Sequence, residues 1–588
     1  MKLISNLTTR WKSIIDTISR FPLAIVLLIV ASIMNVILIS VSNDFTGGVS
    51  SNEIYAKLVI TFLLGALVSV VGQLTYERFF KKKLIRYVYM AGAILSSLVY
   101  YIAVKDTGFD GIKVGIRTFV IFFVLTVLFI WIPVINNRYH FNQSFLAVFK
   151  GFFTSIFFTG VLYLGIVLVL AATDLLIAKL SFQVYQYFAT IIFMVLSPTY
   201  FLSIIPDYQK EETEEERINK LISSSKFIDA LISYIIIPVT IVFTAILIIY
   251  IVLNISGKFW TRNLMEPLLV SYTLTVIVVY LLSCNLQNQI SKLFRKVFPK
   301  VLIPIVLFQT IASVLKINEL GVTYGRYYVI LFGIFALIAG ILFSILPLRK
   351  NGVIAPILVV LALSSIIPPI DSFTVSSGVQ ASRLKNTLVK NDMLQNEKIN
   401  AKANISQEDK DIISSTISYL DEIEETNGIS WLSTYAKSNN FRVTFGFDQY
   451  GAPNNSYVNI NRDESTPISV NGYDYLVRAN YNTGQSNTVI VEFDHDKKAY
   501  SINAVMLDGK PVIQLKQNSQ NLVSIEVSQI FDKFQNESEK QKVHTEELTF
   551  KGENNVAAIA LIANSININD FGADKEQYGD FYILVDLK

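Results

Sequence analysis

The chain has 588 residues, of which 52% are hydrophobic and 16% charged. Its apolar runs reach membrane-spanning length, which excludes an ordinary soluble protein. The net charge of +4 combines a basic part up to Asp371, with 30 Lys+Arg and 17 Asp+Glu, and an acidic remainder with 20 and 29. Because the basic excess lies in loops beside apolar runs, it indicates a membrane surface and no nucleic acid.

The first residues predict a separate element. Lys2, Arg10 and Lys12 lie off a stripe of apolar side chains that recur at helical spacing. This pattern is typical of an amphipathic helix lying on the cytoplasmic lipid surface. We expect that helix over residues 1–20.

Eleven apolar stretches, each of roughly 20 residues, then predict a multi-pass transmembrane helical domain over residues 21–371. An odd number of crossings would place the chain ends on opposite sides of the lipid bilayer. The predicted spans are 22–41, 57–74, 87–104, 114–135, 152–172, 187–206, 227–253, 264–284, 299–316, 327–346 and 353–370.

Loop charge predicts the orientation. With a cytoplasmic N-terminus, the inside segments hold 21 Lys+Arg and the outside segments 9. The positive-inside rule then places the C-terminal domain outside the cytoplasm. The single cysteine, Cys284, allows no intramolecular disulfide, which fits a bacterial plasma-membrane protein.

Polar residues inside apolar spans are candidates for function, because hydrocarbon solvates them poorly. The carboxylates lie near span ends, where side chains can reach the interface. An anchoring role is therefore favoured over the ion coupling of a permease or transporter. The candidates are Asp174, Asp229, Glu266, Gln73 and Gln309.

Prolines interrupt several spans, at Pro198, Pro238, Pro304 and Pro356. Broken helices can expose backbone carbonyls that line a substrate site. A simple kink is the more common case.

A membrane transferase acting on a lipid-linked substrate would need carboxylates outside the bilayer. Asp44 and Glu53 lie in the first predicted outer loop, and Asp106 and Asp110 in the second. Such pairs could bind a metal or act as a base. Both loops are short, and their Asp and Gly residues suit tight turns, so the turn interpretation is favoured.

Residues 372–588 predict an extracytoplasmic α+β domain. Helices are expected over 376–394, from the N-cap Ser406 to Gly428, and around 429–436. The pattern then changes to strands, while 522–534 and 557–567 suit either state. The predicted strands are 442–447, 457–461, 473–480, 488–493, 500–507, 512–515, 547–550 and 581–586.

No catalytic, nucleotide-binding or metal-binding signature is evident. Asp494-His495-Asp496 is the most tempting cluster, but its three side chains cannot all face one metal, because alternate strand side chains point to opposite faces. Asp494 and Asp496 could share a face, but no second cluster in the sequence offers completing ligands. A polar hairpin end is the favoured interpretation. We expect no cofactor and favour a non-enzymatic role.

Short motifs resemble the uncharacterised bacterial multi-pass membrane family known as domain of unknown function 4153. They are Arg20-Phe21-Pro22-Leu23, Leu384 with Asn391-Asp392-Met393-Leu394, and Asn404-Ile405-Ser406 with Ile413-Ser414-Ser415 and Tyr419-Leu420. The resemblance implies a bacterial multi-pass protein and supplies no activity.

Three functions remain. The favoured one is a ligand- or partner-binding, sensory envelope protein whose outer domain meets an envelope protein or glycan. The alternatives are a permease or transporter, and a membrane transferase acting on a lipid-linked substrate. The sequence leaves the oligomeric state open.

Overall fold

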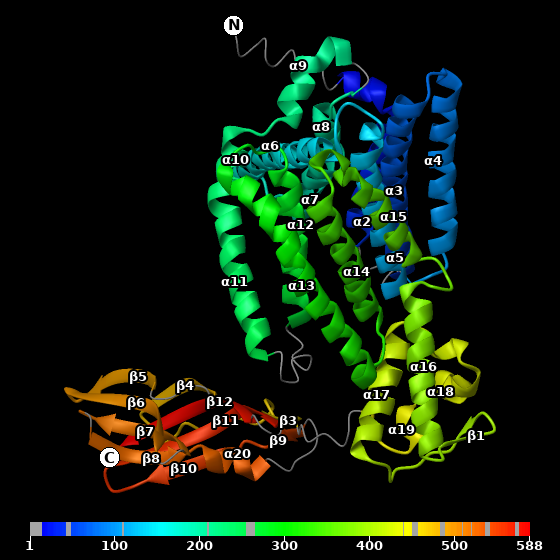
Figure 1. The fold of residues 1–588 in the computed structure, drawn as a ribbon. Helices are drawn as coiled ribbons and strands as arrows, with labels where there is room; N and C mark the ends of the chain where they lie inside the picture. Colours follow the sequence, from blue (N-terminus) through cyan, green and yellow to red (C-terminus); the bar gives the residue numbers. More distant parts are fainter. Residues whose placement is uncertain are drawn as a thin grey trace. The chain divides into compact units, whose positions relative to one another are not determined.

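The computed structural model describes residues 15–42, 49–108, 111–208, 211–254, 265–438, 440–449, 457–482, 488–507, 510–518, 520–534, 541–570 and 575–588. The chain divides into two compact units, Met1–Asn440 and Phe441–Lys588. The first unit is helical and the second is built mainly of strands (Figure 1).

The first unit begins with helices that run back and forth (Figure 1). Its elements up to Ser364 are α2 (Pro22–Ser42), α3 (Val49–Phe79), α4 (Lys83–Val104), α5 (Ile112–Trp131), η1 (Ile132–Val134), α6 (Phe141–Leu176), α7 (Phe182–Ile191), η2 (Ile192–Leu196), α8 (Ser197–Ile204), α9 (Glu211–Ile222), α10 (Lys226–Leu231), η3 (Ile232–Ile236), α11 (Ile237–Asn254), α12 (Met265–Ser283), α13 (Gln289–Leu320), α14 (Tyr324–Ile345), η5 (Leu348–Val353) and α15 (Ile354–Ser364).

Nine helices among the described residues are long and apolar enough to cross a membrane. They are Pro22–Ser42, Asn52–Phe79, Lys83–Val104, Ile112–Val134, Phe141–Leu176, Phe182–Ile204, Ile218–Leu253, Gln289–Ile317 and Tyr324–Ile345. A helix satisfies its own backbone hydrogen bonds, which hydrocarbon requires. The predicted fold class, a multi-pass helical bundle followed by a C-terminal domain containing β-sheet, is confirmed.

Two predicted spans correspond to shorter helices. The prediction at 264–284 matches the apolar helix Pro267–Ser283. The prediction at 353–370 contains α15, which has only 11 residues and ends at Ser364. The prolines at 368 and 369 lack the N–H that a longer helix would need. Eleven membrane crossings therefore stay a prediction.

Two of the interrupting prolines follow wide helical turns. The π-helical segments η2 and η3 each end two residues before a proline, Pro198 and Pro238. A π turn accommodates the clash and the missing donor that proline brings to a helix. Pro304 lies inside α13, and Pro356 lies in the first turn of α15, where a free N–H is not needed. The helical path therefore continues through these positions.

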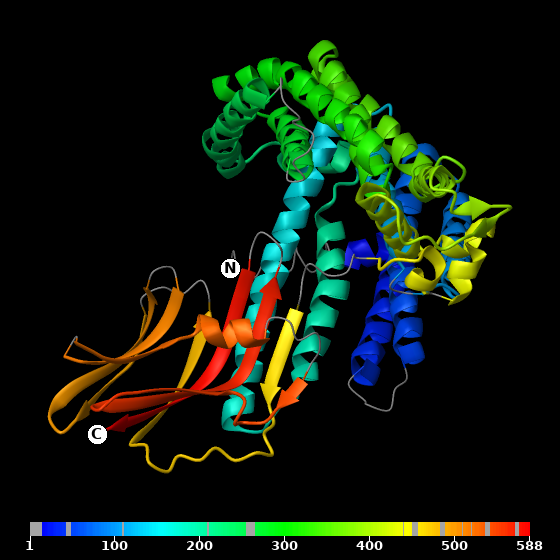
Figure 2. The same ribbon diagram turned by 90° about the horizontal axis from the view of Figure 1, so that it is seen from below.

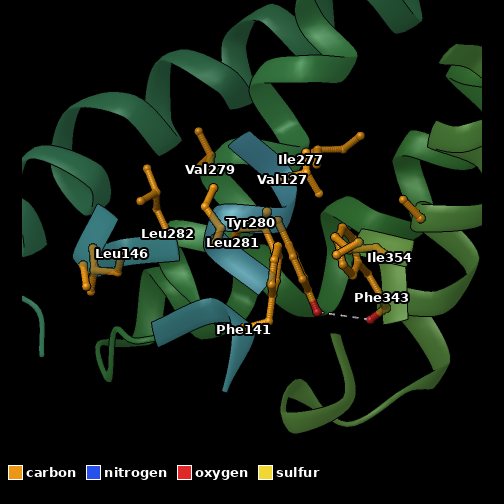
Figure 3. Packing of buried hydrophobic residues seen from close by; sticks show 14 of the residues in the cluster. Val127, Phe141, Leu146, Ile277, Val279, Tyr280, Leu281, Leu282, Phe343 and Ile354 are labelled. Atoms are coloured by element: carbon orange, nitrogen blue, oxygen red, sulfur yellow. Dashed lines mark hydrogen bonds between the residues drawn. The ribbon is translucent and has the colours of Figure 1, made fainter. Parts of the chain in front are cut away.

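Most helices of the first unit contribute to one large buried apolar cluster, and smaller clusters lie beside it. Figure 3 shows part of it, with Tyr280 of α12 against Phe343 of α14. Their rings stack with centroids 4.1 Å apart, and the Tyr280 hydroxyl donates to the Phe343 carbonyl at 3.3 Å. Small residues bring α13 and α14 close, since a Cβ added at Gly333 would lie 2.4 Å from the Thr310 Oγ1.

The first unit ends with a helical segment, residues 372–440. It contains α16 (Ser372–Lys390), the short hairpin β1 (Leu394–Gln395) and β2 (Lys398–Ile399), α17 (Gln407–Glu422), η6 (Thr426–Gly428), η7 (Ser430–Leu432) and α18 (Ser433–Ser438). Ser406 caps α17 as predicted, its hydroxyl accepting from the Asp409 N–H at 3.2 Å. The segment belongs to the same compact unit as the membrane helices, so the unit boundary lies at 440/441, whereas the predicted domain boundary is 371/372.

In its described residues, the second unit contains two sheets and two short helices, α19 (Phe441–Phe445) and α20 (Ser528–Phe534). The larger sheet has the order β4-β12-β11-β3-β9, with β10 also paired to β11, and the smaller has the order β5-β6-β7-β8 (Figure 2). The strands are β3 (Tyr457–Arg462), β4 (Tyr475–Asn482), β5 (Thr488–His495), β6 (Lys498–Leu507), β7 (Lys510–Gln517), β8 (Gln520–Glu526), β9 (Gln541–Val543), β10 (Thr549–Glu553), β11 (Ala557–Asp570) and β12 (Lys575–Leu587).

Both sheets and α20 contribute to one apolar core. Ile460, Leu515, Phe531 and Phe581, from β3, β7, α20 and β12, are fully buried in it. The alternation of apolar and polar side chains predicts this arrangement, because it places one face of each strand inward. The predicted strands from 457 onward are present. Of the two ambiguous stretches, 522–534 divides into β8 and α20, and 557–567 lies in β11.

One strand prediction is wrong. Residues 442–447 were expected to form a strand, but Phe441–Phe445 is the helix α19. The ring of Phe441 packs against the ring of Phe445, with centroids 4.6 Å apart, and against the ring of Phe447, which follows the helix. Helical spacing brings positions i and i+4 together, which the alternating strand interpretation missed.

The predicted hairpin end at Asp494-His495-Asp496 is present. β5 and β6 pair from His495↔Lys498, and Asp496 and Lys497 both have positive φ. That is the backbone of a tight two-residue hairpin turn. Residues 1–14 of the predicted N-terminal helix lie outside the described residues, whereas residues 15–20 are helical.

Candidate functional site

An apolar cavity of about 670 Å³ lies among α5, the start of α6, α12, α14 and α15. We call it the apolar groove. Its lining includes Phe119, Phe123, Leu274, Ile277, Phe332 and Leu358. These side chains come from apolar stretches, so the groove follows directly from the hydrophobicity that makes the helices membrane-spanning. Its volume is within the roughly 300–1,000 Å³ typical of small-molecule sites.

The groove opens on the outer surface of the helical region. Phe119 is 70% exposed and Leu274 is 52% exposed, although both line the cavity. In a bilayer these faces would meet lipid tails. A second apolar cavity, of about 610 Å³, shares Thr126, Ile130 and Phe145 with the groove. Apolar space therefore lies on both sides of α5.

One end of the groove is bounded by polar groups, which we call the mouth. Next to the lining residue Ile116, Arg117 donates from Nη2 to Asp371 Oδ2 at 3.0 Å. The Asp371 side chain is fully buried. Burial alone would raise the pKa of Asp371, but hydrogen bonding from Thr374 and Arg117 and the charge of Arg117 outweigh it, so the pKa lies below its usual value. Asp371 is therefore ionised near neutral pH.

The pair at the mouth is incompletely satisfied. Arg117 Nε and Asp371 Oδ1 are both buried and have no hydrogen-bond partner among the described residues. Buried polar atoms normally have partners, and leaving one unsatisfied costs about 1–3 kcal/mol. The mouth thus offers one donor and one acceptor.

Segment 372–440 is attached to the mouth through α17. The Tyr324 N–H donates to the Tyr419 hydroxyl at 2.8 Å, and the Tyr324 hydroxyl donates to Glu422 at 3.1 Å. Lys113 and Glu425 form an ion pair nearby. Tyr324 also lines the groove. Tyr324 of α14 therefore contacts both the groove and the segment, which links an occupant of the groove to the segment through one residue.

Gln73, a predicted intramembrane candidate, belongs to a hydrogen-bond network. Its Nε2 donates to Glu77 and its Oε1 accepts from Arg86, both at 2.9 Å. Glu77 also receives a bidentate pair from Arg20 at 2.8 and 2.9 Å, and Arg20 donates to the Ile205 carbonyl at 3.1 Å. The network joins the helical residues 15–20, α3, α4 and the residue that follows α8. Its bonding indicates a structural role for Gln73.

The other intramembrane candidates are not brought together. Asp174 Oδ1 accepts from the Leu180 N–H at 2.6 Å and so closes a loop. Asp229 lines a polar pocket at the helix ends. Gln309 is 1% exposed in α13, and neither of its amide atoms has a partner among the described residues. Glu266 lies in the first turn of α12, but its side chain is outside the described residues.

The predicted outer-loop carboxylates form no group in the described part of the loops. Glu53 lies 3.5 Å from Lys57 Nζ, which also donates to the carbonyls of Lys105 and Thr107. Asp106 is exposed and lies 3.6 Å from Lys105 Nζ. Asp44 and Asp110 lie outside the described residues. Within the described ranges, no group of three or more His, Cys, Asp or Glu side chains could hold a metal ion.

Sequence reasoning missed the mouth and a buried lysine. Arg117 and Asp371 are 254 positions apart, and each reads locally as an ordinary charge at a span end. Lys316 is 3% exposed within α13. Its position inside an apolar span is visible in the sequence and would have been enough to include this lysine among the intramembrane candidates.

Comparison with known proteins identifies the family. The model of the family described as "Domain of unknown function (DUF4153)" matches residues 33–405, which is more than half of the chain. No curated protein and no solved structure matches. The resemblance expected from the sequence motifs is confirmed, and the chain belongs to the DUF4153 family.

Proposed function

We propose that this integral membrane protein is a non-enzymatic sensor that binds an amphiphile in the apolar groove. The observation that carries the proposal is the groove itself: about 670 Å³ of apolar space with an ion pair at one end. An amphiphile has the same two-part chemistry, a hydrocarbon chain and a polar group. Its chain would enter from the bilayer past Phe119 and Leu274, and its polar group would meet Arg117 and Asp371.

The proposal includes a bacterial plasma membrane, with a cytoplasmic N-terminus and an extracytoplasmic C-terminal domain. Two observations support this orientation. Lys and Arg are concentrated in the segments assigned to the inside. Contacts between distant segments also sort into two ends: Arg20 meets Ile205, and Asn142 meets Leu348, whereas Arg117 meets Asp371. On this orientation an envelope protein or glycan is the expected partner outside.

Segment 372–440 would report the occupancy of the groove. Tyr324 lines the groove and holds Tyr419 and Glu422 of α17. A ligand can shift the segment only through different contacts in the bound and free states. Tyr324 contacts both the groove and α17, so its contacts are the ones that we expect to differ between the bound and free states.

Photo-crosslinking tests the proposal. The full chain in lipid nanodiscs would be irradiated with a diazirine-bearing phospholipid, and labelled peptides would be identified by mass spectrometry. Gly325→Phe adds a ring at a lining position where a Cβ meets nothing within 4 Å. A block that weakens binding by about 1.4 kcal/mol lowers labelling of the groove about tenfold.

Gly165→Phe is the matched control, since Gly165 in α6 also has open space at its Cβ. It should leave labelling of the groove unchanged. Equal labelling in Gly325→Phe and wild type would overturn the proposal. Recovery of a chemically altered lipid would instead support the transferase alternative, and protein-dependent passage of the lipid between leaflets would support transport.

A further inference from the structure

A second, polar pocket of about 690 Å³ lies at the opposite end of the helical region from the mouth. It is formed by the start of α6, the end of α9, α10, the turn after α12, and η5. His140, Asn142, Asp229 and Cys284 are among its lining residues. It shares no lining residue with the apolar groove.

The side-chain amide N–H groups of Asn142 and Asn285 donate to backbone carbonyls of the protein. Asn142 Nδ2 donates to the Leu348 carbonyl at 2.9 Å, and Asn285 Nδ2 donates to the Asn142 carbonyl at 3.0 Å. The bond to Leu348 fixes which way the Asn142 amide points. If the amide were flipped, its oxygen would face the Leu348 carbonyl oxygen, and neither atom could donate.

Two oxygen acceptors in the pocket are left over. Asn142 Oδ1 and Asp229 Oδ1 are buried and have no hydrogen-bond partner among the described residues. Asn142 is only 4% exposed, so its side chain is held in place. Asp229 lies in the first turn of α10. The imbalance points to an occupant that donates hydrogen bonds.

Charge narrows the chemistry further. Asp229 is the carboxylate of the pocket, and burial together with the nearby Arg349 lowers the pKa of His140, which is therefore neutral near pH 7. Cations also lie close: Arg349 lines the pocket but is exposed, and Lys150 Nζ donates to the carbonyl of the lining residue Ser223 at 2.8 Å. The unpartnered acceptors are thus one carboxylate oxygen and one amide oxygen, which suit a group that carries several N–H donors and a positive charge.

We propose that the polar pocket binds a small protonated amine, whose N–H groups donate to Asn142 Oδ1 and Asp229 Oδ1. On the proposed orientation the pocket faces the cytoplasm. The site shares no lining residue with the apolar groove, so the proposal does not rest on an amphiphile in the groove.

Cys284 provides the test, because it lines the pocket and is the chain's single cysteine. The rate at which methyl methanethiosulfonate modifies Cys284 would be measured by mass spectrometry on the full chain in nanodiscs. Methylammonium chloride is the probe, compared with tetramethylammonium chloride and potassium chloride at equal ionic strength. Methylammonium should slow the modification saturably, by at least about fivefold, because it alone has N–H donors.

Asp229→Asn should remove that protection while leaving the thermal unfolding midpoint near the wild-type value. Asp174→Asn is the matched control, since Asp174 contacts the Leu180 N–H and lies outside the pocket lining. It should retain full protection. Equal protection by potassium or tetramethylammonium would overturn the proposal in favour of a general ionic effect. No protection by methylammonium would overturn it in favour of water alone.

Discussion

The two ends of the helical region hold their polar side chains in different ways. At the N-terminal end, Arg20, Glu77, Gln73 and Arg86 bond mainly to one another and to nearby carbonyls. At the other end, the Arg117–Asp371 pair joins a membrane helix to segment 372–440. The first arrangement fixes membrane helices together, whereas the second fastens a peripheral segment to them. Changes at the two ends should therefore have separable effects.

The largest effect is expected from Arg117→Met. Removing the guanidinium leaves the fully buried Asp371 carboxylate without its counter-ion. Breaking a buried pair costs about 3–5 kcal/mol, and we expect about 3 because Arg117 itself is partly exposed. Lys105→Met is the control, since the Lys105–Asp106 pair is exposed, and it should cost under about 1 kcal/mol. Denaturant unfolding of the full chain in micelles measures both. Equal costs would contradict a special role for the mouth.

Glu77→Gln should cause the next largest loss of stability. The amide keeps the shape of Glu77 but leaves Arg20 without its counter-ion. We expect a loss of about 2 kcal/mol, typical of a hydrogen bond to a charged group. Glu53→Gln is the control, because Glu53 is more exposed and its contact with Lys57 is 3.5 Å long. If the comparison holds, Glu77→Gln destabilises the membrane helices, and the hydrogen-exchange rates of segment 372–440 equal those of the wild type.

Acid should loosen the segment first. Asp371 and Asp409 both have pKa values below the ordinary value of an aspartate, because hydrogen bonds outweigh the effect of burial, from Thr374 and Arg117 to Asp371 and from Lys390 and Ser406 to Asp409. Groups with depressed folded pKa values stabilise the protein above the unfolded pKa, and this contribution is lost as the pH falls through the folded pKa. Protection of residues 372–440 from hydrogen exchange should therefore fall below about pH 4. Asp371→Asn with Asp409→Asn should remove that pH dependence; a persistent transition would assign it to other groups.

The smallest effect is expected from Tyr419→Phe. The hydroxyl accepts from the Tyr324 N–H and donates to Ser376 Oγ at 2.7 Å. Its loss should cost about 1 kcal/mol and raise hydrogen exchange in α17 without affecting α2 to α4. Tyr435→Phe, which removes a contact to Asp421 within the segment, provides the comparison. A larger change at the N-terminal end than in α17 would contradict the separation of the two ends.

Local patterns predicted several features well. Apolar length identified the long membrane helices, the Ser406–Asp409 spacing identified the start of α17, and alternation identified the strands of the second unit. These succeed because each depends on residues close in sequence. The helix at Phe441–Phe445 was missed because the apolar residues of 441–447 suit either spacing, and the packing of Phe441 against Phe445 decides between them.

The candidate sites depended on distant partners. In the sequence, Arg117 and Asp371 look like ordinary charged residues at the ends of two spans. Only the fold brings them together as an ion pair. Nothing in the sequence around Asn142 marks it as a candidate. It becomes one in the structure, where its amide nitrogen donates to the Leu348 carbonyl and its amide oxygen is buried without a partner among the described residues. Gln73 looked like a functional candidate until its bonds to Glu77 and Arg86 showed a structural use.

The sequence by itself determined that this chain is a multi-pass membrane protein with a β-rich C-terminal unit, because hydrocarbon accepts only segments that satisfy their own backbone hydrogen bonds. The tertiary structure alone decided which polar groups are satisfied and which are left over. The physical reason is that satisfaction of a buried donor or acceptor depends on what lies within about 3 Å of it, and for the groove mouth and the polar pocket those neighbours come from remote parts of the chain.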